Sequence, residues 1–121
     1  MARAGRGPDA ATAFIDALDD LDMALDDALR MIGEMRGRCA AIRAAHAHGN
    51  RLREIVSAER TPPLVQLLTR TTSLLHSYGN RVRRAEAQAL HDEGMTMEEI
   101  AALFGVSRQR VSALLRDRRP L

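Results

Sequence analysis

Apolar residues recur near the start of the chain at alternating spacings of four and three. The series continues for more than four heptads without a slip and comprises Phe14, Leu18, Leu21, Leu25, Ala28, Ile32, Met35, Cys39 and Ile42. This spacing places apolar side chains along one stripe of a helix, and such a stripe is buried against other helices. The sequence therefore predicts a long N-terminal helix that forms either a coiled coil or part of a bundle.

Composition favours an all-α fold. Aromatic residues make up only 2% of the 121 residues, and most apolar residues are good helix formers such as Ala, Leu and Met. β-branched residues are sparse, so a sheet is not expected. No apolar run reaches the roughly 18 residues of a membrane span. A single cysteine, Cys39, excludes an internal disulfide and suits a reducing cytoplasm. We therefore expect a cytoplasmic, nucleoid-associated protein with no membrane partner.

Local signals mark where the helices begin and end. Pro8-Asp9 is typical of a helix start, and Gly49-Asn50 is typical of a C-cap, although one helix running through to Glu59 is the alternative. Thr61 is predicted to cap the next helix, with Pro62 in its first turn. Gly79-Asn80 either ends that helix or only weakens it.

Charge is distributed unevenly along the chain. Residues 1–48 hold six Arg and eight acidic residues, whereas residues 49–121 hold twelve Arg and eight acidic residues. Every basic residue is Arg, whose planar fork suits phosphates and guanine edges. The basic second half is therefore compatible with nucleic acid, and a compositional habit of the source genome is the alternative explanation.

Residues 84–116, with the sequence RAEAQALHDEGMTMEEIAALFGVSRQRVSALLR, predict three short helices. The first covers Ala85–His91 and ends at Asp92-Glu93-Gly94. Thr96 and Glu99 have the spacing of a capping box at the start of a second helix, Met97–Phe104. Gly105 is expected to adopt a positive φ in a tight turn, and Ser107 is expected to cap the third helix.

The same stretch resembles the helix-turn-helix superfamily. In that family an apolar and a small residue lie on the first helix of the pair. The turn carries Gly, an apolar residue and a capping Ser or Thr, and the second helix carries a β-branched and a later apolar residue. The matching residues are Ile100 and Ala101, then Gly105, Val106 and Ser107, then Val111 and Leu114. Two subtypes are similar, the sigma-factor promoter-recognition domains and the resolvase-type modules, and the choice between them stays open.

The resemblance implies that the last helix enters the DNA major groove with its N-terminal residues at the base edges. It assigns base contacts to Arg108, Gln109, Ser112 and Ala113, because Arg suits guanine and Gln suits adenine. Phosphate contacts are expected from helix starts and nearby Arg residues, namely Thr96, Ser107, Arg110, Arg116, Arg118, Arg119, Arg81, Arg83 and Arg84. The alternative is that these Arg side chains form a solvated face or bind protein.

The expected function is that of a bacterial-type, sequence-specific transcriptional regulator, a homodimer that binds double-stranded DNA. In this organisation residues 1–8 are a disordered tail, 9–60 a helical dimerisation region, 61–80 a connecting helix and 81–121 the helix-turn-helix domain. Two-fold pairing of the N-terminal helices, parallel or antiparallel, predicts inverted half-sites about 34 Å apart or a multiple of that distance.

Two other functions remain open. The acidic heptad helix could dock a protein partner such as an RNA polymerase component, which would make the chain an adaptor. The chain could also be an accessory to a recombinase or transposase. An enzyme is not expected, because no catalytic triad, paired catalytic carboxylates or phosphate-binding Gly loop is present in the sequence. No cofactor is expected either, and no metal site, because His46 and His48 are two residues apart on a helix and do not face one another.

Overall fold

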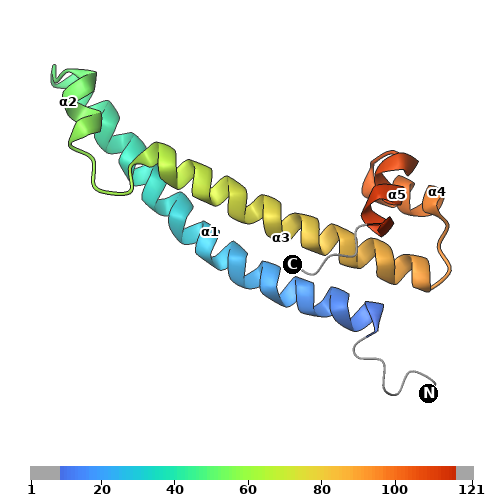
Figure 1. Ribbon diagram of the computed structural model, residues 1–121. Coiled ribbons are helices and arrows are strands. Elements are labelled where there is room, and N and C mark those ends of the chain that lie inside the picture. Colours follow the sequence, from blue (N-terminus) through green and yellow to red (C-terminus); the bar gives the residue numbers. More distant parts are fainter. Residues whose placement is uncertain (1–8, 117–121) are drawn as a thin grey trace. The chain divides into compact units, whose positions relative to one another are not determined.

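A computed structural model describes residues 9–116, and within this range every regular element is a helix (Figure 1). The helices are α1 (Ala10–Ala47), α2 (Leu52–Ser57), α3 (Leu64–Asp92), α4 (Met97–Phe104) and α5 (Arg108–Arg116). The expected fold class is confirmed, with a long N-terminal helix and a small C-terminal module of short helices. No helix in the part of the chain that the structure describes is long and apolar enough to cross a membrane. The predicted tail, residues 1–8, and the candidate phosphate ligands Arg118 and Arg119 lie outside the described residues.

The ends of α1 follow the local signals. The Thr12 backbone N–H donates to Asp9 Oδ1 at 2.9 Å, so Asp9 caps the helix. At the other end Gly49 adopts a φ of +91°, and the Asn50 backbone N–H donates to the Ala45 carbonyl at 3.2 Å. The predicted C-cap at Gly49-Asn50 is confirmed, and the alternative of one helix through to Glu59 is wrong.

The predicted cap of α3 is wrong. This helix begins at Leu64, so Thr61 and Pro62 both precede it. The Leu64 backbone N–H donates instead to Glu59 Oε2 at 2.9 Å. A carboxylate that folds back from five residues upstream therefore satisfies this N–H, and its negative charge suits the positive end of the helix dipole. Beyond this start, α3 runs through Gly79-Asn80 without a break, so that pair does not end the helix.

The chain divides into two compact units, each formed by part of α1 and part of α3. One contains residues 23–76, and the other contains, among the described residues, 9–22 and 77–116. In the first unit, the Thr71 hydroxyl of α3 lies 3.5 Å from Met31 Sδ of α1 and donates to the Leu67 carbonyl at 2.8 Å. In the second unit, Arg81 of α3 and Asp20 of α1 form an ion pair at 2.5 Å.

Alanines form most of the face that α1 buries within the chain. Ala17, Ala24 and Ala28 are between 1% and 4% exposed. Leu18 and Leu25, one position further along and part of the heptad series, remain 37% and 43% exposed. The heptad stripe is therefore only partly used by the chain's own packing, because Leu18, Leu25 and Ile32 remain exposed.

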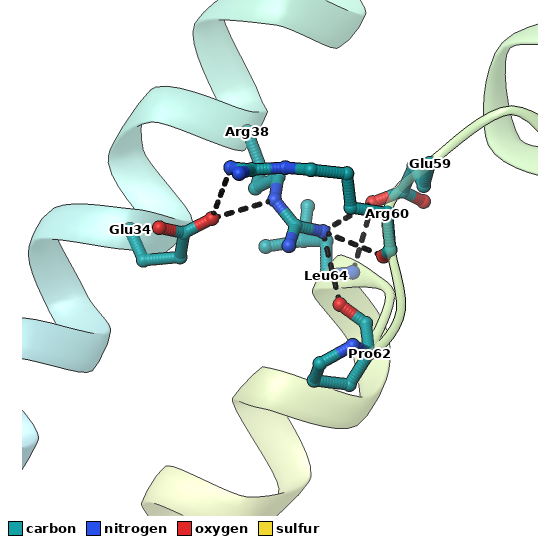
Figure 2. A network of polar contacts seen from close by, with 6 residues as sticks. All are labelled: Glu34, Arg38, Glu59, Arg60, Pro62 and Leu64. Carbon is teal, nitrogen blue, oxygen red and sulfur yellow. Dashed lines mark hydrogen bonds and ion pairs between the residues drawn. The ribbon is translucent and has the colours of Figure 1, made fainter.

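An Arg-centred network joins α1 to the segment that precedes α3 (Figure 2). The Arg38 guanidinium, whose side chain is 11% exposed, donates to Glu34 Oε2 at 2.9 Å and pairs with Glu59 Oε2 at 3.5 Å. It also donates to the backbone carbonyls of Arg60 at 3.2 Å and Pro62 at 3.0 Å. The five fixed N–H donors of Arg suit such a set of acceptors, and the network holds the turn between α2 and α3 against α1.

Candidate nucleic-acid interface

The C-terminal module is built around a small apolar core contributed by α3, α4 and α5. Its buried members are Ala87, Ile100, Ala101, Val111 and Leu114. Ile100 and Val111 are fully buried, and burying a side chain of this size contributes about 2 kcal/mol. The partly buried side chains packed around them are Leu90, Met95, Met97, Phe104 and Leu115. The helical residues that carry the helix-turn-helix resemblance, Ile100, Ala101, Val111 and Leu114, all lie in this core.

Two local motifs cap the N-terminal ends of α4 and α5. Thr96 and Glu99 form a reciprocal capping box, in which the Glu99 N–H donates to Thr96 Oγ1 at 3.1 Å and the Thr96 N–H donates to Glu99 Oε1 at 2.8 Å. Ser107 Oγ accepts a hydrogen bond from the Arg110 backbone N–H at 3.0 Å, as expected of an N-cap. Both predicted caps are confirmed. Both hydroxyl oxygens only accept in these caps, so any phosphate contact from Thr96 or Ser107 would use the hydroxyl O–H as donor.

The turn between the two helices depends on Gly105. This residue adopts the left-handed conformation predicted for it, with φ +68° and ψ +34°, and its N–H donates to the Ala101 carbonyl. A Cβ at this position would meet no atom within 4 Å. The requirement for Gly therefore comes from the backbone conformation and not from a lack of space.

The outer surface of α5 carries the residues proposed to contact bases. Arg108 and Gln109 are exposed, whereas Ser112 and Ala113 are partly buried. Helical spacing places Gln109, Ala113 and Arg116 on the face opposite Val111, which is the side away from the core. Gln109 is thus exposed at the surface of α5, whereas Ser112 is only partly exposed.

Two of these side chains have partners within the module. Arg108 Nε lies 2.9 Å from Glu98 Oε2 of α4, and both side chains are more than 60% exposed. The Arg116 guanidinium donates to Ser112 Oγ at 2.8 Å. The Glu98 carboxylate therefore competes for the Arg108 guanidinium with any base or phosphate that would bind there. Sequence reasoning missed Glu98; its acidic side chain in the first turn of α4 marked it as a possible partner for a cation but did not show which Arg it would meet.

The candidate phosphate-binding Arg residues of α3 and α5 lie in two different environments. Arg83 and Arg110 line one groove of about 320 Å³, together with Glu86 and apolar side chains that include Leu103 and Val106. The Arg83 guanidinium also donates to Asn80 Oδ1 at 3.1 Å. Arg81 is paired with Asp20 and is only 32% exposed, so its charge is already balanced by a carboxylate of α1. The geometry thus brings Arg83 and Arg110 together and sets Arg81 apart from them.

A protein-family comparison matches the same module. Residues 79–118 match the model of the helix-turn-helix family described as "Homeodomain-like domain". The match covers about a third of the chain and, within the described residues, takes in the C-terminal part of α3, α4 and α5. No curated protein and no solved structure matches the chain. Residues 79–118 are thus a homeodomain-like helix-turn-helix domain, and the caps, turn and core of the described part fit that class.

Proposed function

We propose that the protein is a homodimeric transcriptional regulator that reads DNA sequence with α5. The observation that carries the proposal is the family match at residues 79–118, combined with an α5 that packs Val111 and Leu114 inward and exposes Arg108 and Gln109. In a helix-turn-helix domain the second helix of the pair lies in the major groove. A sigma-factor-like or resolvase-like subtype is part of the proposal.

In this proposal the exposed start of α5 reads bases and the surrounding Arg residues hold phosphates. Arg108 and Gln109 contact base edges, with Ser112 and Ala113 against the same groove. Arg110 and Arg83, which share a groove, contact one stretch of the phosphate backbone, and Arg116 contacts another. Thr96, Ser107, Arg84, Arg81, Arg118 and Arg119 complete the proposed set of phosphate contacts.

The dimer explains how a small module reaches useful affinity. A single module makes few base contacts, whereas linking two of them raises the effective concentration of the second at its half-site. The proposal assigns residues 9–60 to dimerisation, residues 61–80 to a connecting helix and residues 81–121 to DNA binding. The proposed dimer binds inverted half-sites that lie about 34 Å, or a multiple of that distance, apart.

The test is selection of bound duplexes from a random DNA pool at two salt concentrations. We expect enrichment of an inverted repeat and weaker binding at the higher salt, because phosphate contacts release counterions. The double variant Arg108→Ala, Gln109→Ala should lose the enriched sequence. Arg70→Ala removes an exposed Arg from the other unit and should leave it unchanged. Salt-sensitive binding without enrichment would contradict sequence-specific regulation, and no binding at either salt would favour the adaptor function.

A further inference from the structure

One apolar surface of the unit formed by residues 23–76 has no partner within the described chain. On α1, Leu25, Leu29 and Ile32 are 43%, 66% and 41% exposed. On α3, Val65 and Leu68 are 68% and 56% exposed. Large apolar side chains gathered in this way mark an interaction surface more often than single exposed residues do.

These side chains lie on the same side of the α1–α3 pair. Leu25 and Leu29 each follow a buried alanine by one position, and Leu68 follows the buried Leu67 by one position. The contacts of Met31 with Thr71 and of Arg38 with Pro62 show that the two helices run antiparallel here. In an antiparallel pair, the residue after each inward-facing one projects to the same side from both helices. The exposed residues therefore form one surface and not two.

Charge along α1 indicates what covers this surface. Residues 9–29 hold seven carboxylates and no Arg, whereas residues 30–47 hold four Arg and one Glu. Arg38 is engaged within the chain, so the exposed cations of this half are Arg30, Arg36 and Arg43. A second α1 in parallel orientation would place the carboxylates of one copy beside those of the other. A second α1 in antiparallel orientation would place the acidic half of each copy beside the basic half of the other, which is the complementary arrangement.

Two charged residues within the apolar stripe set the register. Along α1 the spacing of three and four runs through Asp22, Leu25, Leu29, Ile32 and Arg36, and both charged side chains are exposed. Asp22 lies seven residues before Leu29, and Arg36 lies seven residues after it. A two-fold axis near Leu29 would therefore bring Asp22 of each copy beside Arg36 of the partner subunit.

We propose that two copies of the chain pair through α1 in antiparallel orientation, with the two-fold axis near Leu29 and two reciprocal Asp22–Arg36 ion pairs. This inference rests on the homodimer of the proposed function and adds its orientation and register. Val65 and Leu68 of α3 flank the same surface and extend the apolar contact between the two copies.

Cysteine cross-linking of the full chain in solution tests the orientation. In the antiparallel register, the Cys39 residues of the two copies lie about 30 Å apart along the helix axis, because each is ten residues from the axis of symmetry. A disulfide needs Cα atoms within about 7 Å. We expect the native protein to form no Cys39 disulfide under mild oxidation, and the Leu29→Cys, Cys39→Ser variant to form an intersubunit disulfide. A native Cys39-linked dimer, or no cross-link at position 29, would overturn the proposal.

Charge exchange tests the register with an independent readout. Asp22→Arg and Arg36→Asp should each raise the dimer dissociation constant by roughly fivefold, and the double variant should restore it. Asp19→Arg, an exposed residue off the stripe, is the matched control and should have a smaller effect. Failure of the double variant to restore pairing would refute the register. Sedimentation of the wild type as a monomer would refute pairing itself, whereas sequence-specific DNA binding, measured separately, decides the rest of the proposed function.

Discussion

Gly105 allows the turn between α4 and α5 because it adopts a left-handed backbone conformation. At a φ of +68°, a residue with a Cβ is strained even though the added atom would meet nothing. Gly105→Val should therefore lower the free energy of unfolding of the module by about 2 kcal/mol or more, because β-branching resists this φ most strongly. Gly105→Asn should cost less, since Asn tolerates the left-handed region. Urea unfolding measures both, and equal losses for the two variants would contradict the conformational explanation.

Glu98 is the ion-pair partner of Arg108 at the start of α5, where the proposed base contacts lie. Its carboxylate pairs with Arg108, and it would also repel nearby phosphates. Because the pair is exposed, releasing it costs at most about 1 kcal/mol. Glu98→Gln should strengthen DNA binding by about two- to fivefold, and Arg108→Ala should weaken it. Anisotropy titration on the selected duplex measures both changes, and a weaker Glu98→Gln complex would show that the pair helps to position Arg108 for binding.

At the scale of helices and turns, the predictions that were confirmed are those whose physics is local. Thr96, Gly105, Ser107 and Gly49 each act on atoms within a few residues, so the caps and turns of α1, α4 and α5 could be predicted from spacing alone. The start of α3 could not, because the carboxylate that serves it comes from Glu59 across a turn. Nor could spacing show that Arg108 would pair with Glu98, since that contact depends on how α4 and α5 pack.

The heptad series shows that spacing alone also cannot predict which face of a whole helix is buried. Spacing predicted that one stripe of α1 would be buried, but two neighbouring stripes satisfy a period of three and four. The chain buries the stripe that contains Ala17 and Ala24 and leaves Leu18 and Leu25 about two-fifths exposed. Which of the two faces α3 is decided by the side chains that α3 offers, and no local pattern contains that information.

The Arg38 network predicts a sharp difference between two Arg residues of α1. Arg38 is nearly buried and serves two carboxylates and two carbonyls, whereas Arg43 is exposed. Arg38→Lys keeps the charge but loses the planar fork, and should lower the free energy of unfolding by about 2 kcal/mol. Arg43→Lys is the control and should change it by less than about 0.5 kcal/mol. Similar melting curves for the two variants would mean that the network adds little to stability.

For the whole molecule, folding and association should be separable at Leu25. This residue is 43% exposed within one chain, so a charge there has access to solvent in the monomer and would be buried only in a dimer. Leu25→Asp should therefore yield a monomer whose helical content and melting temperature stay close to those of wild type. Analytical ultracentrifugation and circular dichroism test the two halves of this prediction. Loss of helical structure together with the dimer would show that Leu25 supports the fold itself.

The two proposed activities of the molecule use different helices. Association is assigned to α1, whose exposed stripe includes Leu25 and Leu29, and DNA binding is assigned to α5, which exposes Arg108 and Gln109. Variants of α1 can therefore be tested for binding to a single DNA half-site, and variants of α5 can be tested for dimerisation. A variant that keeps the activity assigned to the other helix is still folded.

The buried alanine face of α1 can be detected by some kinds of substitution and not by others. Ala17, Ala24 and Ala28 already carry the smallest side chain that retains a Cβ, so truncation to alanine, the usual survey of a packed surface, leaves them unaltered. Enlargement is the informative change, because added methylenes have to displace neighbouring atoms and typically cost about 1–3 kcal/mol. Substitution by Leu along α1 should thus lower the free energy of unfolding at these three positions, which an alanine scan cannot test. Natural variation there should be confined to other small residues such as Gly, Ser and Cys.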